Sequence, residues 1–142
     1  MDKEELIARV SELGLPRGQY CVVGKGPLVV RGICEGSGID ILVNPDVYSV
    51  FKEMPGWEEV RGDTNGLVLV NPPFTLVREF GFGDYWQEPD TLFTTADFVD
   101  DVAFAPLDEI AALKRAIGEA HDQAELALIN EYLYDHPDGD EI

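Results

Sequence analysis

The stretch that decides the fold comprises residues 20–43, which read YCVVGKGPLVVRGICEGSGIDILV. Two apolar runs, Tyr20–Val23 and Ile39–Val43, stand at its ends, and glycine-rich turns flank a short apolar segment at residues 27–31. Glycine marks such turns because it adopts positive φ angles without steric cost. The pattern predicts a strand, a glycine turn, a short helix, a loop and a second strand, which carries Asp40 in an otherwise apolar run.

Upstream of this stretch, residues 1–14 predict an N-terminal helix. Asp2 can cap the first turn, and Glu5 stands three residues later, which is the spacing of a capping box. Apolar side chains recur at helical spacing from Leu6 to Leu13, so we expect them to face the core. Gly14 is expected to end the helix, because glycine is favoured just beyond a helix C-terminus.

Downstream, the sequence alternates helix and strand signals up to an acidic end. Asn44 is a favoured helix cap and Pro45 a favoured first residue, so a helix is expected after the second strand. The further expected elements are that helix at residues 44–54, an antiparallel meander at 57–61, 67–70 and 74–80 with a turn at 62–66, a loop at 81–90, a helical turn at 91–96, a hairpin around Asp100-Asp101, helices at 106–118 and 121–134, and a frayed tail at 136–142.

The length of 142 residues is enough for a single core, so we expect one domain spanning residues 1–142. The mixture of elements predicts an α/β (α+β) class with a small mixed sheet and helices packed mainly on one side. No apolar run is long enough to span a bilayer, and residues 1–5 lack the features of a signal peptide. These observations favour a cytoplasmic protein with no membrane partner.

The net charge of −18 argues against an extended nucleic-acid interface, which requires a basic surface. It argues equally against binding to anionic lipids. Two interpretations of this charge remain open. The first is that the protein comes from a salt-loving host. The second is that its surface is simply acidic and well solvated. Thermal stability measured against KCl concentration separates the two, because only the first predicts a gain at high salt.

Two parts of the sequence resemble small nucleotidyltransferases. Gly24-Lys25-Gly26 follows the first strand, where that fold has a Gly-Ser turn, and Asp40 lies on the second strand, where it has an Asp-x-Asp pair. The second part is residues 114–122. Small bacterial and archaeal members of the family often carry Lys-Arg-x-x-Gly-Arg-x-Lys-Asp there, and this chain matches it at Lys114, Arg115, Gly118 and Asp122, with Glu119 and His121 in place of two basic residues.

The resemblance implies a phosphate-and-metal site. Nucleotide phosphates are then expected near Gly24, Lys25 and Gly26, where a helix N-terminus also favours anions, and near Lys114. Asp40 is the expected catalytic and Mg²⁺-binding carboxylate, because Mg²⁺ prefers oxygen ligands. The reaction implied is transfer of a nucleotidyl group from a nucleoside triphosphate (NTP) to a hydroxyl group.

Glu79 is the candidate for a further catalytic and Mg²⁺-binding carboxylate. It alternates with apolar neighbours on an expected strand, so its orientation depends on the strand register. Gly38 stands where the first aspartate of the Asp-x-Asp pair is expected. Glu79 is then the only candidate for a second metal-binding carboxylate beside Asp40. With only two histidines in the chain, a histidine-based metal site is not expected.

Each of these residues also has a structural interpretation. Asp40 could accept backbone hydrogen bonds at a strand edge, Glu79 could be a solvated strand residue, and Lys114 a solvated helix residue. The aromatic residues of segment 80–86 could stack on a base, or they could pack in the core or at a dimer contact. The alternative function is therefore a non-catalytic interaction protein, antitoxin-like or a partner subunit, which keeps the fold and binds a protein partner or a second copy of itself.

Overall fold

The computed structural model describes residues 1–62 and 66–138. The centre of the expected turn at 62–66, residues 63–65, and the last four residues of the expected tail lie outside them. The helices are α1 Lys3–Glu12, α2 Gly26–Val29, α3 Pro45–Lys52, α4 Pro89–Thr95, α5 Leu107–Ile117 and α6 Ala120–Asp135. The strands are β1 Tyr20–Val23, β2 Ile39–Val43, β3 Glu58–Arg61, β4 Leu67–Asn71, β5 Phe74–Val77, β6 Phe80–Phe82, β7 Tyr85–Gln87, β8 Asp97–Val99 and β9 Val102–Phe104.

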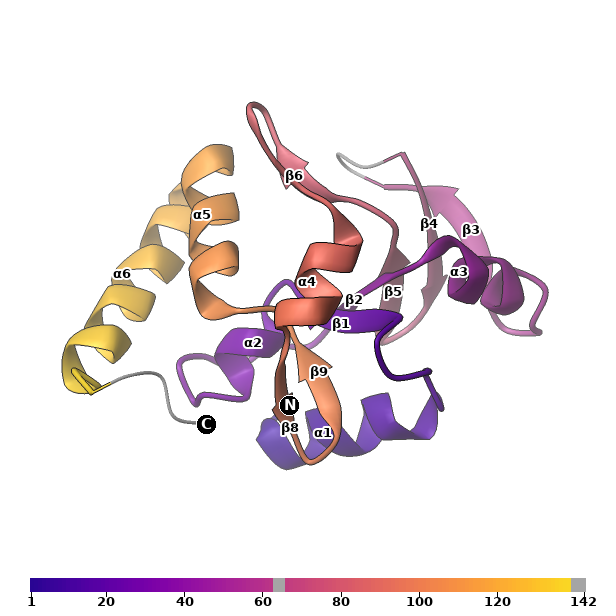
Figure 1. The fold of residues 1–142 in the computed structure, drawn as a ribbon, viewed down its shortest axis with the longest axis horizontal. Helices are drawn as coiled ribbons and strands as arrows, with labels where there is room; N and C mark the ends of the chain where they lie inside the picture. The colour runs from indigo at the N-terminus through magenta and orange to yellow at the C-terminus, as the bar shows by residue number, and fades with distance from the viewer. Residues whose placement is uncertain (63–65, 139–142) are drawn as a thin grey trace.

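A mixed sheet of seven strands forms the centre of the molecule, in the order β3-β4-β5-β2-β1-β9-β8. The pairs β2–β5 and β1–β9 are parallel, and the other neighbours in this sheet are antiparallel. Figure 1 shows α5 and α6 side by side at one end of the molecule and α3 beside β3 and β4 at the other. The arrangement confirms the expected α/β class and the antiparallel meander of β3, β4 and β5.

The core is one continuous cluster that runs from Leu6 on α1 through β1 and β2 to Ile129 on α6. All four residues of β1 are buried, and on β2 only Asp40 is exposed. Burying such an aliphatic side chain stabilises a fold by roughly 2 kcal/mol. These two central strands therefore hold the middle of the fold, and Asp40 interrupts them at one end.

Local signals in the sequence explain where several elements begin and turn. The Asp2 carboxylate accepts a hydrogen bond from the Glu5 amide at 2.9 Å, and Asn44 caps α3 in the same way. Asp100 and Asp101 both have positive φ angles between β8 and β9, as a two-residue hairpin turn requires. The expected caps and the expected hairpin are thereby confirmed.

The segment after β5 differs from the prediction. Strand β5 ends at Val77 rather than at Phe80, and the expected loop forms a second, two-stranded sheet of β6 and β7. Gly83 turns the chain with φ +61°, and Gly81 lies against the Trp86 ring, where a Cβ atom would clash. Two strands of three residues are too short to show a clear alternation of apolar and polar side chains, so the aromatic pattern here predicts a loop rather than a hairpin.

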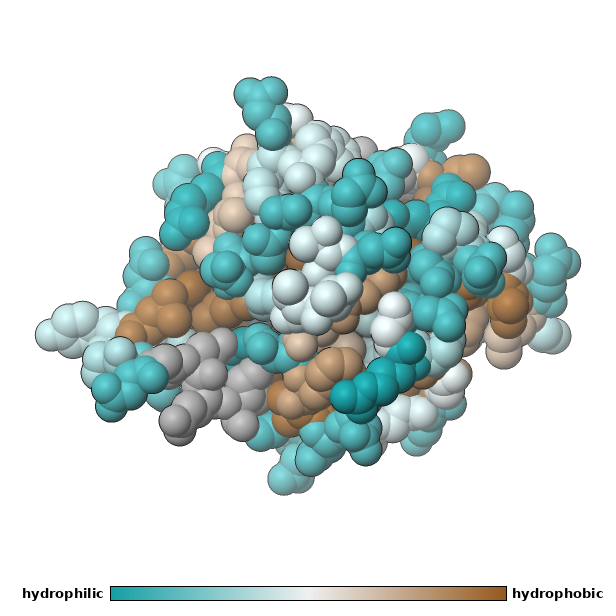
Figure 2. Space-filling model, in the orientation of Figure 1, coloured by the Kyte–Doolittle hydropathy of each residue, from teal (hydrophilic) through white to brown (hydrophobic). Residues whose placement is uncertain are grey.

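The surface reflects the acidic composition. Figure 2 shows a mainly hydrophilic face with a few separate hydrophobic patches, one of them over the α5–α6 end of the molecule. None of the helices in the described ranges combines the length and the apolar character that spanning a membrane requires.

Candidate functional site

A cleft of about 460 Å³ lies where the ends of β1 and β2 face β6, α5 and α6. It is lined by five of the residues that the sequence marks as candidates: Gly24, Lys25, Asp40, Glu79 and Lys114. The sixth, Gly26, is buried, and a Cβ atom on it would clash with the Val22 side chain, so its role is close packing of α2 against β1. Candidates from four separate parts of the sequence therefore meet in one place.

Asp40 lies against the Gly24 backbone. In the register of β1 and β2 it is opposite Val23, so the next residue, Gly24, passes beneath its side chain. Gly24 has φ +63°, and a Cβ atom on it would lie 2.6 Å from Asp40 Oδ2. The site thus needs glycine here for two reasons, the positive φ angle and the room for a carboxylate.

The environment of Asp40 disfavours its charge. The carboxylate reaches solvent in the cleft, but the surrounding protein raises its pKa through desolvation. A cation bound at this carboxylate would reverse that effect, because an opposite charge favours the ionised form. Without such a cation, Asp40 holds its proton more tightly than an ordinary aspartate does.

Lys25, by contrast with Asp40, is exposed to solvent. It precedes α2, which is only four residues long, so the aligned peptide dipoles behind the turn are too few to form the anion site expected from a helix N-terminus. Any attraction for phosphate at this turn must come mainly from the Lys25 ammonium group.

Glu79 is also exposed and lies just beyond the end of β5. In the parallel register of β2 and β5, the neighbour of Asp40 is Thr75, and Glu79 follows it by four residues. Within residues 1–62 and 66–138, the only group of three or more metal-ligand side chains close together contains neither Asp40 nor Glu79. Metal binding by this pair stays a prediction.

The opposite wall of the cleft buries charges. Three charged residues on α5 and α6 are each less than a tenth exposed: Lys114, Asp122 and Glu125. Lys114 Nζ lies 3.5 Å from Glu125 Oε1. Glu125 Oε2 is buried, and none of residues 1–62 and 66–138 forms a hydrogen bond with it. The alternative interpretation of Lys114 as a solvated helix residue is wrong, because Lys114 is an interior cation whose charge is compensated by Glu125.

Cys34 lies close to charged residues of both walls. Burial raises the pKa of its thiol, and the charge of Glu125 raises it further. The charges of Lys25 and Lys114 act in the opposite direction. The Cys34 thiol therefore lies near charged groups from both walls.

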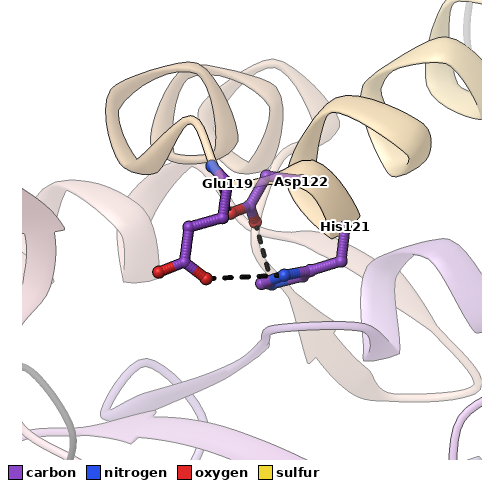
Figure 3. A group of neighbouring side chains, drawn as sticks. All are labelled: Glu119, His121 and Asp122. Atoms are coloured by element: carbon purple, nitrogen blue, oxygen red, sulfur yellow. Dashed lines mark hydrogen bonds and ion pairs between the residues drawn. The ribbon is translucent and has the colours of Figure 1, made fainter.

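A second cluster of polar side chains lies in the first turn of α6. Figure 3 shows the His121 ring between the carboxylates of Glu119 and Asp122. His121 Nδ1 lies 3.6 Å from Glu119 Oε2, and Nε2 lies 3.4 Å from Asp122 Oδ1. Asp122 Oδ2 also accepts a hydrogen bond from the Glu119 amide at 3.3 Å, which closes the helix end.

The number of histidines in the sequence does not predict this cluster, because its other two members are carboxylates. The available signal was Glu119-x-His121-Asp122 directly after Gly118, whose φ of +68° ends α5 and turns the chain into α6. All three side chains of the cluster line the same cleft as Asp40.

Comparison with known proteins leaves the family open. A scan against models of protein families finds no match, and searches of curated proteins and of solved structures find no significant match. The likeness to nucleotidyltransferases therefore rests on the residues of this chain alone.

Proposed function

We propose that the cleft binds a nucleoside triphosphate together with a divalent metal ion, as a nucleotidyltransferase-like protein would. One observation carries the proposal. Gly24, Lys25, Asp40, Glu79 and Lys114 are the residues to which the family resemblance assigns phosphate and metal binding, and they line a single cleft although they come from distant parts of the chain. A surface pocket formed by chance would not be expected to gather this set.

Each wall has a distinct role in this proposal. Lys25 is an exposed ammonium group on a flexible stem, suited to follow a phosphate chain. Lys114 is held in place by Glu125 and would present a positioned N–H donor to a phosphate oxygen. Asp40, with Glu79 as the second candidate, would hold Mg²⁺, and the bound ion would neutralise phosphate charge.

The charge balance of the cleft makes the metal necessary for binding. Its carboxylates outnumber its lysines, since Lys25 and Lys114 face this set: Asp40, Glu79, Glu119, Asp122 and Glu125. A bare triphosphate would meet net repulsion here and from the whole chain, which carries a charge of −18. The NTP is therefore expected to bind as its metal complex.

The proposed reaction is transfer of the nucleotidyl group to an acceptor hydroxyl. The hydroxyl oxygen forms a bond to the α-phosphorus, the bond from that phosphorus to the bridging oxygen breaks, and pyrophosphate leaves. The hydroxyl proton passes to solvent. Glycine at position 38 removes one carboxylate of the usual pair, so we expect transfer to be slow relative to binding.

Calorimetric titration with each NTP, with and without Mg²⁺, tests the binding. We expect saturable binding only with metal, and a loss of about tenfold or more in Asp40→Asn. Asp46→Asn, an exposed aspartate on α3 away from the cleft, is the matched control. Labelled NTP with a panel of hydroxyl acceptors then tests transfer. Absence of binding in every titration would defeat the proposal, whereas binding without transfer would leave a nucleotide-binding protein that has lost catalysis.

A second candidate function is non-catalytic interaction through α6. Leu128, Leu133 and Tyr134 expose apolar surface on this helix, and Tyr134 is 85% exposed. Exposed apolar side chains of this kind are available for contact with a partner. Light scattering of the purified chain tests for a homodimer, with Leu133→Glu expected to give a monomer. A monomeric wild type that also fails to co-purify with any host protein would argue against this function.

A further inference from the structure

We propose that a second pocket, beside the cleft, binds a small organic cation that carries a primary ammonium group. The pocket has a volume of about 460 Å³ and lies at the base of the β6–β7 hairpin. Its lining consists of Glu79, Phe80, Trp86, Gln87, Glu88 and Pro89. Only Glu79 and Phe80 of this set also line the cleft, so the argument for the pocket does not depend on nucleotide binding.

The indole ring of Trp86 is exposed to solvent and yet held in one orientation. The residue is 51% exposed, and its Nε1–H donates to the Gly83 carbonyl oxygen at 2.8 Å. Trp86 pairs with Gly81 in the hairpin, and the absence of a side chain on Gly81 lets the ring lie against the backbone. The ring therefore packs on the hairpin on one side, while its remaining surface is open. Such a ring attracts cations, because its face carries the negative part of the quadrupole.

Two carboxylates lie on the same side of the hairpin as this ring. Phe80 pairs with Gln87, so the antiparallel register, continued by one residue, sets Glu79 opposite Glu88. Side chains alternate along a strand, and Glu88 follows Trp86 by two residues, so the two point to the same side. Like charges directly opposite each other destabilise a strand pair. A bound cation would remove this repulsion.

Within residues 1–62 and 66–138, neither Glu79 nor Glu88 forms an ion pair with a basic side chain. The described residues that line the pocket include no lysine, arginine or histidine. Glu88 directly precedes α4, but its side chain makes no capping hydrogen bond to that helix. Both carboxylates are therefore available to accept hydrogen bonds from a ligand.

The combination of one aromatic ring and two carboxylates selects the kind of ligand. A primary ammonium group has three N–H donors, and its hydrogen bonds to carboxylates are strengthened by charge. Its alkyl chain can lie along the indole ring. A phosphate or carboxylate ligand would meet like charge here and from the whole chain, which carries a charge of −18. A neutral nucleobase stacked on Trp86 would leave the two carboxylates uncompensated.

NMR titration of the metal-free, nucleotide-free full-length protein with diaminobutane, a chain with an ammonium group at each end, tests the pocket. The chain has two tryptophans, so the indole N–H resonances report on the pocket and on an internal reference. We expect a saturable shift at Trp86 and little change at Trp57, which packs edge-on against Phe51 and does not line the pocket. Butanediol, the neutral analogue of equal length, and KCl at equal ionic strength should give no saturable shift.

A substitution of one carboxylate tests the charge directly. Glu88→Gln keeps the size of the side chain, and we expect it to weaken the binding of diaminobutane by about tenfold, because a charge-assisted hydrogen bond is lost. Glu53→Gln, an exposed glutamate at the end of α3, is the matched control. Both glutamates are exposed, so neither variant should disturb folding.

Several results would overturn the proposal. They are the absence of a saturable shift at Trp86, equal binding of diaminobutane and butanediol, and equal affinity of Glu88→Gln and the wild type. A saturable shift with adenosine in place of diaminobutane would assign the ring to a nucleobase instead. Since neither metal nor NTP is present in this titration, failure of the pocket and failure of NTP binding are distinguished.

Discussion

The two walls of the cleft place their polar groups by different means. The strand wall consists of Gly24, Lys25 and Asp40 at the ends of β1 and β2. Backbone register and one glycine position it above an apolar core. The helix wall consists of Lys114 on α5 and residues 119–125 at the start of α6. It is held by ionic groups that are themselves buried.

The two walls differ in how much free energy the burial of charged side chains costs. Burying a charge costs several kcal/mol unless a partner compensates it, so apolar residues would usually make the more stable interface. Among the residues that line the cleft, this cost is concentrated in the helix wall, at Lys114, Asp122 and Glu125. Outside the cleft, the Arg31 side chain is also buried and pairs with Asp97. The strand wall keeps its cation exposed and its core apolar. The helix wall is therefore the part of the cleft whose stability should depend most on charge.

The largest expected effect comes from exchanging the lysine of each wall for methionine. Lys114→Met leaves Glu125 buried without a counter-charge, and we expect a loss of about 3 kcal/mol in the free energy of unfolding. Lys25→Met removes an exposed charge and should change it by less than about 0.5 kcal/mol. Urea unfolding of both variants measures the contrast.

The double variant Lys114→Met/Glu125→Leu isolates the cause. It removes both charges and keeps similar volume, so most of the lost stability should return. Equal losses from the two single lysine variants would show that the walls do not differ in the way described.

The next effect tests the glycine of the strand wall. Gly24→Ala places a Cβ atom 2.6 Å from Asp40 Oδ2 at a positive φ, so we expect a loss of about 1–2 kcal/mol from the backbone together with displacement of Asp40. Gly14→Ala is the matched control, because Gly14 has φ +65° and nothing within 4 Å of the added atom. Comparable thermal shifts in both would mean that contact with Asp40 adds nothing.

A smaller effect concerns the hairpin that borders the cleft. The Tyr85 hydroxyl donates to Glu109 Oε2 at 2.8 Å and attaches β7 to α5. Tyr85→Phe should cost about 1 kcal/mol, the usual net value of one hydrogen bond. Tyr134→Phe removes a hydroxyl from an exposed ring and should be neutral. A neutral Tyr85→Phe would indicate that the hairpin is held by its aromatic packing instead.

The smallest effect is the pH dependence of Asp40. Desolvation raises its pKa in the folded state, so the folded protein holds this proton more tightly than the unfolded chain does. Stability from this group is then lost as pH rises from the ordinary value of 3.8 through the raised pKa. Asp40→Asn should be more stable than the wild type at neutral pH by about 0.5 kcal/mol, because cleft solvent screens the charge. The difference should shrink on acidification, and a destabilised Asp40→Asn at neutral pH would contradict the sign.

The strand wall could be predicted from the sequence because its signals are local. A glycine between two apolar runs and a single aspartate in the second run predict the turn, the strands and the position of Asp40. The predicted strands and the expected α/β class are confirmed. What this wall binds stays a prediction.

The helix wall could not be predicted in the same way. Its contacts join α5 to α6, and whether Lys114 meets solvent or Glu125 depends on how the two helices pack. The buried face of α6 carries Asp122 and Glu125 as well as Ile129, so the helix has little amphipathic pattern to read. The β6–β7 hairpin escaped prediction for a related reason, since its strands are only three residues long.

If both walls belong to one ligand site, a nitrogen-15 NMR titration of the backbone amides should show both of them responding to the same ligand. Addition of NTP with Mg²⁺ should shift the resonances of Gly24 and Lys25 together with those around Lys114 and Asp122, and both sets should saturate at the same concentration. The amides of β3, at the far edge of the sheet, serve as the internal reference. Shifts confined to one wall, or no saturable shift with any nucleotide, would contradict the claim.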